Sequence, residues 1–389
     1  MRFVLFSAQY LPTVGGVERY THNLAQTLAG MGHTVLVVTS ALPGQPAQQT
    51  QPDGTQVLRL PSFLWLKGRF PVLKPGAAGR KQAALLWQQT FDFALINTRF
   101  YPLSLFAANF CKKQGIPAAV LEHGTAHLSM GNPVLNTLGN WYEHWAIGYI
   151  RRRCKAFYGV SGASASWLQH FGIKAKGVLY NAVNPTVLQT LASSSLCNFR
   201  QQYGLLPSAP VVVYSGRFIP EKGIFELLDA FAQLHKTMPE VTLIMAGDGP
   251  CLDEVKARNQ AGVVCTGMLP HNQSLALLSQ ATVFCLPSYS EGFSTVILEV
   301  AALKTAIVTT PTGGSPELIG DGKAGILLQN LQPDTIAAAL QKALCEPAWR
   351  SQAEEKAYQT LTQRFTWQKT AEALVEIATK NPSGEGKGA

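Results

Sequence analysis

The chain has 389 residues, of which 47% are hydrophobic and 14% are charged. At roughly 100–200 residues per domain this length predicts two domains, and the composition excludes a disordered chain, which combines low hydrophobicity with high charge. The net charge of +9 by itself allows nucleic acid, a membrane surface or an acidic substrate as partner. The charge is uneven, because residues 1–190 hold 17 Lys and Arg against 5 Asp and Glu, a net of +12, whereas the remainder holds 15 against 18, a net of −3.

Seven cysteines lie far apart along the chain, and no two of them form a CxxC pair. This pattern favours neither a disulfide framework nor a structural zinc site, and it fits a reducing cytoplasm. No stretch of 18 apolar residues exists, so the sequence predicts no membrane-spanning helix. We therefore expect a cytoplasmic protein.

Short apolar runs alternate with amphipathic segments along the whole chain. In the first half the runs predict strands at 2–8, 34–40, 93–97, 118–123, 155–161 and 177–181. Between residues 16 and 35, apolar residues recur at steps of three and four, which predicts a helix. The second half repeats the alternation, with strands predicted at 211–216, 241–247, 263–267, 283–288, 306–310 and 325–329.

Apolar strands that alternate with helices are typical of parallel βαβ units, because such strands are buried on both faces. Two sets of these units predict an α/β chain of two Rossmann-like, doubly wound domains that face a central cleft. We place the N-terminal domain at residues 1–184 and the C-terminal domain at 185–365, since Asn184-Pro185 and a serine run interrupt the pattern there. Open α/β sheets bind ligands at the carboxyl ends of their strands, so we expect the ligand in the cleft.

Candidate site residues of the first half follow predicted strands. Gly15 and Gly16 stand between the first strand and its helix, where a ligand could approach the backbone and a helix N-terminus favours anions. A tight strand-to-helix turn is an equally open interpretation. His123 ends the strand at 118–123 and His127 follows closely. A lone histidine is often structural, and the spacing does not decide which of the two faces a ligand.

The second half begins with a strand that is followed by two cations. Gly216 and Arg217 end this strand, and Lys222 stands at the start of the next helix. Arginine can bind a diphosphate in two-pronged fashion and lysine adds a point charge, so the pair predicts a diphosphate site. The alternative is a pair of solvated surface cations. The sequence GDGP at 247–250 predicts a turn.

A segment with glycines and carboxylates follows the strand at 283–288. Glu291 and Glu299 lie eight residues apart, too far for a close dyad, and each could accept hydrogen bonds from the hydroxyls of one ligand. Glu299 could instead serve the dipole of a helix that starts near Thr295. Three backbone amides before this helix are expected to point at the ligand: those of Gly292, Phe293 and the N-cap candidate Ser294.

Motifs of several other enzyme classes do not occur. The sequence contains no GxxxxGK[ST], no HExxH, no GxSxG and no Asp-x-Asp pair that would hold a metal on a diphosphate. We therefore expect Arg217, Lys222 and helix N-termini to neutralise the diphosphate, with no metal ion and no cofactor.

Four segments in this order resemble the GT-B, family 4 type of retaining glycosyltransferase (glycosyl transferases group 1), over almost the whole chain. They are GGVER near the start, GRF with EKG, GDGP, and the Glu-x7-Glu pair followed by GGSPE. The hinge segment departs from the pattern, with YNAVN in place of the common PNGVD, and Lys304 replaces a usual glycine.

The resemblance implies a metal-independent enzyme that moves a hexose-type sugar from a nucleotide-diphosphate sugar to a lipid-linked or growing polysaccharide or glycoconjugate acceptor, with retention of anomeric configuration. In this scheme Arg217 and Lys222 hold the diphosphate, with Gly216 beside them. Glu299 binds the ribose, and Glu291 with the three amides that follow it holds the donor sugar.

The resemblance also implies roles for the N-terminal domain. Gly16 approaches the phosphates or the acceptor, and His123 lies near the transferred sugar. A last helix at residues 366–380 crosses back onto this domain.

Basic and aromatic residues are interleaved in the first half. One segment holds Lys67, Arg69, Lys74, Arg80 and Lys81, and another holds Trp141, Tyr142, Trp145, Tyr149, Arg151–Arg153 and Lys155. This combination suits the surface of an anionic membrane, although cations also occur at helix C-termini and in solvated loops. Together with the net charge of +12, it predicts peripheral contact with the inner face of the cell membrane and a role in cell-envelope polysaccharide biosynthesis.

Two alternatives use the same fold. A nucleotide-sugar epimerase needs no acceptor and leaves the basic half unexplained. A non-catalytic, glycosyltransferase-like binding subunit would be expected to have lost some of Arg217, Lys222, Glu291 and Glu299, which are all present. Nucleic acid is not expected, because no nucleic-acid-binding motif accompanies the charge.

Overall fold

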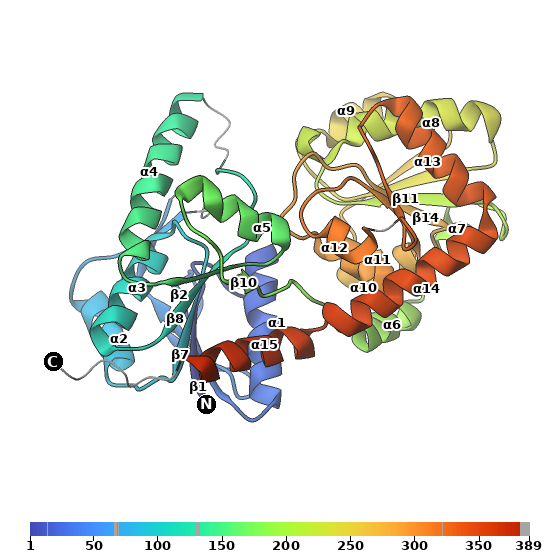
Figure 1. Cartoon of the computed structure of the whole chain (residues 1–389). Helices are drawn as coiled ribbons and strands as arrows, with labels where there is room; N and C mark the ends of the chain where they lie inside the picture. Colours follow the sequence, from blue (N-terminus) through green and yellow to red (C-terminus); the bar gives the residue numbers. More distant parts are fainter. Residues whose placement is uncertain (14, 66–67, 69, 129–132, 321, 382–389) are drawn as a thin grey trace. The chain divides into compact units, whose positions relative to one another are not determined.

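The computed structural model describes residues 1–381 apart from 14, 66–67, 69, 129–132 and 321. The predicted basic residues Lys67 and Arg69 lie outside the described residues. The chain forms two compact units (Figure 1). The first consists of Met1–Asn181 with Trp367–Ala389, and the second of Ala182–Thr366, so the chain passes between the units twice.

The sheet of the first unit has eight strands in the order β10-β9-β8-β7-β1-β2-β4-β3. All neighbours are parallel except β3 and β4. The strands are β1 (Arg2–Phe6), β2 (Thr34–Ser40), β3 (Gln48–Thr50), β4 (Gln56–Leu60), β7 (Phe93–Asn97), β8 (Ala118–Glu122), β9 (Ala156–Gly159) and β10 (Gly177–Val178). Because the chain extends the sheet first to one side of β1 and then from β7 to the other, the topological switch point lies between β1 and β7.

The helices of the first unit cover this sheet. They are α1 (Gly16–Gly30), α2 (Ala77–Trp87), α3 (Pro102–Gln114), α4 (Pro133–Arg151), α5 (Gly162–Trp167), the 3₁₀ helix η1 (Leu168–Phe171) and α15 (Trp367–Lys380). One large apolar core packs beneath α3 and α4 around Phe6, Phe110 and Ile147. A two-stranded antiparallel hairpin, β5 (Ser62–Trp65) with β6 (Phe70–Leu73), stands apart from the main sheet.

The second unit holds a six-stranded parallel sheet in the order β13-β12-β11-β14-β15-β16. Its strands are β11 (Val211–Ser215), β12 (Thr242–Ala246), β13 (Val263–Gly267), β14 (Val283–Leu286), β15 (Ala306–Thr309) and β16 (Ile326–Leu327). Its helices are α6 (Pro185–Ser194), α7 (Phe199–Gln202), η2 (Pro220–Lys222), α8 (Ile224–Thr237), α9 (Leu252–Ala257), α10 (His271–Ser279), α11 (Thr295–Ala302), α12 (Ser315–Ile319), α13 (Pro333–Cys345) and α14 (Pro347–Arg364). The switch point lies between β11 and β14.

The predicted α/β class with two Rossmann-like units is confirmed, and every predicted strand is present, with its ends either as predicted or shifted by a few residues. Four strands, β3 to β6, were not predicted. In β4 the sequence QVLRL puts a charged residue among apolar ones, which obscures a buried strand. The structure buries that residue, Arg59, and its two terminal nitrogens donate to the carbonyls of Leu11 and Pro46 and to the side chain of Gln49.

Within the described part of the chain, no helix is both long enough and apolar enough to cross a bilayer.

Candidate functional site

The second unit gathers its predicted site residues at the switch point of its sheet. Arg217 and Lys222 follow β11, and Glu291 follows the neighbouring strand β14. The carboxyl ends of adjacent parallel strands meet at one edge, so residues 69 positions apart in sequence become neighbours there. A doubly wound sheet offers its ligand site at this place.

Lys222 and Glu291 form an ion pair, with Lys222 Nζ 2.5 Å from Glu291 Oε1. The side chains are 20% and 11% exposed, so the pair is largely shielded yet reachable from solvent. Ser288 Oγ donates to the same carboxylate oxygen at 3.0 Å. Gly223 has a φ of +65°, and a Cβ at this position would lie 2.0 Å from the Pro287 carbonyl oxygen. A glycine is therefore needed for the segment after Lys222 to lie directly against the loop after β14.

Arg217 lies on the same edge but differs from Lys222 in its surroundings. Its side chain is exposed and makes no hydrogen bond or ion pair with the residues that the structure describes, while its backbone carbonyl accepts a hydrogen bond from the Tyr214 hydroxyl at 2.8 Å. The GDGP turn lies against Gly216, since a Cβ on Gly247 would collide with the Gly216 carbonyl. The structure thus presents one shielded and one open cation beside two glycine-containing turns.

The loop from Glu291 to Ser294 leads into α11 as predicted, and the helix begins at Thr295. Ser294 occupies the predicted N-cap position, although its side chain makes no capping hydrogen bond. Phe293 is buried and its ring meets Phe365 edge-on at 5.2 Å. Gly313 packs against the backbone of this loop. Its φ is +56°, and a Cβ added there would lie 2.5 Å from the Gly292 carbonyl oxygen.

Glu299 lies apart from the Lys222–Glu291 pair in its bonding. It is buried in α11, and its Oε1 lies 2.9 Å from Nε2 of His271, the first residue of α10. His271 is partly exposed, and no sequence pattern predicts this contact because the two residues are 28 positions apart. His271 therefore holds the Glu299 carboxylate in one orientation.

The first unit places His123 directly after β8. Its Nε2 lies 2.9 Å from Oδ1 of Asn97, whose Nδ2 in turn donates to the Phe6 carbonyl. Because an amide oxygen only accepts, His123 Nε2 carries the proton and Nδ1 keeps its lone pair. Loss of hydration lowers the pKa of His123 to about 3, so the imidazole is neutral at physiological pH.

Asn97 links the ends of three strands that meet at the switch point of this sheet. It ends β7, its amide reaches β1 at Phe6, and its carbonyl oxygen receives His123 after β8. Gly16, at the start of α1, is exposed, and a Cβ there would meet no atom within 4 Å. The tertiary structure therefore adds Asn97 as a candidate residue beside His123, which no sequence pattern indicates.

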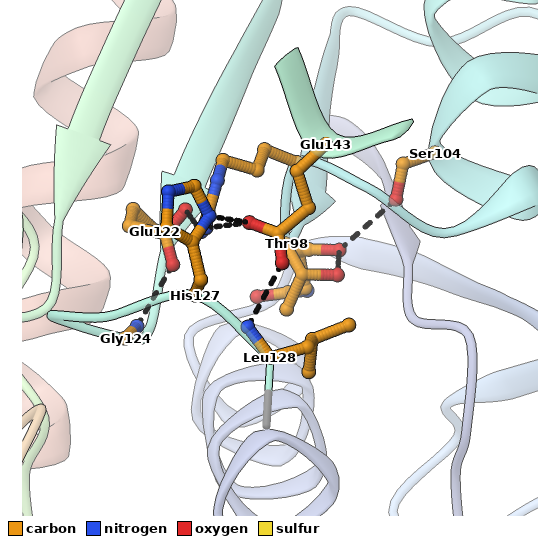
Figure 2. A network of polar contacts seen from close by, with 9 residues as sticks. Thr98, Ser104, Glu122, Gly124, His127, Leu128 and Glu143 are labelled. Atoms are coloured by element: carbon orange, nitrogen blue, oxygen red, sulfur yellow. Dashed lines mark hydrogen bonds and ion pairs between the residues drawn. The ribbon is translucent and has the colours of Figure 1, made fainter. Parts of the chain in front are cut away.

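His127 has different partners from His123. Figure 2 shows it beside Glu143 and Glu122. Both carboxylates belong to a network around the buried Arg99. Arg99 pairs with both carboxylates, and His127 Nδ1 lies 3.0 Å from Glu143 Oε2. His127 thus belongs to a buried ion-pair network of the first unit, whereas His123 bonds to Asn97. The sequence alone did not distinguish the surroundings of these two histidines.

The last helix, α15, packs on α1 of the first unit. Trp367 meets Tyr20 edge-on at 5.2 Å, and Thr370 donates to the Tyr180 carbonyl. Tyr20 also contacts the His123 ring at 5.0 Å, so the C-terminal segment supports the residues around that histidine.

The sequence matches two family descriptions that together span most of the chain. Residues 14–187 match "Glycosyltransferase Family 4" and residues 198–360 match "Glycosyl transferases group 1". A putative teichuronic acid biosynthesis glycosyltransferase, TuaC of Bacillus subtilis, is 34% identical over 284 residues, which is 70% of this chain and 69% of the relative. A glycogen synthase of Mycobacterium tuberculosis is 26% identical over 99% of this chain and 96% of its own length.

Solved structures show the same fold. Sucrose-phosphate synthase from Thermosynechococcus elongatus superposes with a TM-score of 0.75 at 19% identity, over 97% of this chain and 98% of the other. HepE from Anabaena, solved in complex with UDP-glucose, gives 0.72 at 20% identity over 98% and 100%. These GT-B neighbours and the sequence matches agree: the chain belongs to the family 4, group 1 glycosyltransferases.

Proposed function

We propose that this glycosyltransferase takes a hexose-type sugar from a nucleotide-diphosphate donor, without a metal ion and with retention of anomeric configuration. The observation that carries the proposal is the Lys222–Glu291 pair at the switch point of the second sheet. It sets a cation and a sugar-binding carboxylate side by side, where a donor's diphosphate meets its sugar. HepE, a structural neighbour, was solved with UDP-glucose.

The chemistry of the step makes the departing diphosphate the main electrostatic problem. As the bond between the anomeric carbon and the phosphate oxygen lengthens, negative charge grows on the diphosphate, and cations fixed beforehand stabilise it at little reorganisation cost. Lys222 is held in place by Glu291, and the open Arg217 can close onto the diphosphate with two parallel hydrogen bonds. Attack by the acceptor from the same face would retain the configuration.

Glu291→Ala tests the assignment. We expect the variant to lose sugar transfer while it still binds the nucleoside diphosphate, because Arg217 and Lys222 remain. Glu240→Ala, an exposed carboxylate of the same unit, is the matched control and should keep full activity. Full activity of Glu291→Ala would overturn the assignment. Conversion of the donor into another nucleotide-sugar without acceptor would identify an epimerase, and binding without any turnover in the unaltered protein would identify a binding subunit.

We further propose that the acceptor is presented at an anionic membrane, to which α4 docks. Its buried face packs on the core through Glu143, Ala146, Ile147 and Ile150. A second apolar face recurs at steps of three or four on the opposite side of the helix and is exposed: Val134, Leu135, Leu138, Trp141 and Trp145. A helix that is apolar on both its core and solvent sides is typical of membrane or partner docking.

The surroundings of this face favour an anionic bilayer as the occupant. The β5–β6 hairpin contacts α4 through Phe70 and Tyr142, whose rings lie 5.9 Å apart, and adds exposed Phe63 and Trp65. The exposed cations of this region are Lys74, Arg80, Lys81, Arg151, Arg152 and Lys155. Aromatic rings beside cations suit the headgroup layer of an anionic membrane.

Vesicle co-sedimentation tests the docking. The protein should bind vesicles that contain phosphatidylglycerol, and the bound fraction should fall with added salt. Replacing Trp141 and Trp145 together with serine should abolish binding, whereas Leu206→Ser, an equally exposed apolar residue of the second unit, should not affect it. Vesicle binding that does not change with salt, or that persists after both tryptophans are replaced, would contradict the proposal. The Glu291→Ala test is independent of this result.

A further inference from the structure

Three of the eight histidines gather at one place on the first unit. His127 comes from the loop after β8, His144 from α4 and His170 from η1. One ring nitrogen of each lies within 4.8 Å of the others, and the two Nε2 atoms of His127 and His170 are 3.0 Å apart. No other function described above uses this cluster.

The hydrogen bonds of His127 determine which of its nitrogens faces the cluster. Glu143 Oε2 accepts a hydrogen bond from Arg99 and Oε1 accepts one from the Leu128 amide, so this carboxylate acts as an acceptor and His127 Nδ1 donates to it. The lone pair of His127 therefore lies on Nε2 and points at His170. A histidine whose Nδ1–H is held by a carboxylate while Nε2 offers its lone pair is the usual arrangement of a zinc-binding histidine.

The other two histidines of the cluster have side chains that solvent can reach. His144 and His170 are exposed, and His170 stacks on Trp167 with ring centroids 4.7 Å apart. At Zn–N distances of 2.0–2.1 Å, tetrahedral ligand nitrogens are roughly 3.3 Å apart. The His127–His170 pair is already near this separation, and metal binding requires the exposed His144 side chain, whose ligand nitrogen lies within 4.8 Å of the others, to move closer.

We infer that His127, His144 and His170 form a binding site for a divalent transition metal of the zinc class, with Glu143 as the carboxylate that orients His127. Three imidazoles leave a fourth position for water. On binding, the hydrogen shared by the His127 and His170 Nε2 atoms is replaced by the metal, and His170 carries its proton on Nδ1. The site does not depend on the transfer reaction proposed above.

The site has a structural consequence for the loop that carries His123. Glu143 also accepts from the Leu128 amide at 2.9 Å, and Glu122 accepts from the Gly124 amide at 2.8 Å (Figure 2). The loop from His123 to Leu128 is thus tied to the network at both ends. A metal on His127 would fix the distal end of this loop to α4 and η1.

Equilibrium dialysis of the full chain, without a histidine tag, against Zn²⁺ tests the inference. We expect about one Zn²⁺ per chain, and an affinity at least about tenfold lower in His144→Ala and in His170→Ala. Both residues are exposed, so the variants should fold, which circular dichroism can verify. His33→Ala, a partly buried histidine at the N-terminal end of β2, is the control and should bind as the unaltered protein does.

Cobalt gives a second readout. Co²⁺ bound by three imidazoles and water should show visible absorption without a thiolate-to-metal charge-transfer band. A charge-transfer band would place the metal on cysteines and would overturn the assignment. So would the absence of bound Zn²⁺, or equal affinity in the unaltered protein and in the His144 and His170 variants.

Discussion

Removing the Arg99 side chain should strongly destabilise the first unit. Arg99 is 1% exposed, and its guanidinium pairs with Glu122 and Glu143, which are 2% and 1% exposed. Arg99→Met keeps much of the volume but leaves two buried carboxylates without their cation. Breaking a buried ion pair from one side costs about 3–5 kcal/mol, because the abandoned charge stays desolvated.

Urea unfolding followed by tryptophan fluorescence measures this effect in the first unit, which contains Arg99. Six of the seven tryptophans lie in the first unit, and Trp349 alone lies in the second. With an m-value of about 2–3 kcal/mol/M, the loss should lower the urea midpoint by about 1–2.5 M. The control Lys380→Met breaks an exposed pair with Glu376 on the same unit and should leave the midpoint unchanged within error.

A rescue variant separates lost charge compensation from lost packing. Arg99→Met combined with Glu122→Gln and Glu143→Gln removes all three charges and should recover most of the midpoint, because neutral amides need no counter-ion. An Arg99→Met midpoint within about 0.3 M of the unaltered protein would refute the reasoning. It would mean that water reaches both carboxylates.

Three further predictions concern the proposed site. Lys222→Met should weaken binding of a nucleoside diphosphate by roughly 10- to 100-fold, as measured by calorimetry, since it removes a charge-assisted contact worth about 1.5–3 kcal/mol; unchanged affinity would exclude Lys222 from the diphosphate site. Sugar transfer by the His170→Ala variant should persist in EDTA, because the diphosphate is neutralised by side chains, and complete loss would point to a catalytic metal. The pKa of His123 is lowered to about 3, so protonation favours the unfolded state and stability falls as the pH drops below about 6.5. His123→Gln should flatten this dependence by roughly 2 kcal/mol at pH 5, and an unaltered pH profile would contradict the burial of a neutral imidazole.

Much of the architecture follows from local sequence patterns. Strands of a parallel sheet are buried on both faces, so β2 and β7 contain long apolar runs and were predicted with their observed ends. The diphosphate and sugar candidates were found for a related reason: Arg217, Lys222 and Glu291 follow such runs directly, and strand ends of parallel sheets carry ligand sites. The start of α11 at Thr295 was visible from the polar residue before it, although Ser294 does not cap with its side chain.

Other features depended on contacts between distant segments. The tryptophans of α4 suggested the docking face that we propose, but only packing showed which face of this helix the core leaves uncovered. The strand β4 was not predicted because it contains Arg59. The three oxygen atoms that accept hydrogen bonds from its buried guanidinium are known only from the tertiary structure. The different surroundings of His123 and His127 depend on their partners Asn97 and Glu143, which are 26 and 16 residues away in the chain.

The sequence by itself determined that the protein has two parallel α/β units, and where each unit offers cations and carboxylates, because burial periodicity and strand ends are local properties. Only the tertiary structure decided which of those groups meet. The Lys222–Glu291 pair, the Glu299–His271 contact and the three-histidine cluster each join elements that strand order brings together. Sheet order is set by packing over the whole domain, and no short stretch of sequence records it.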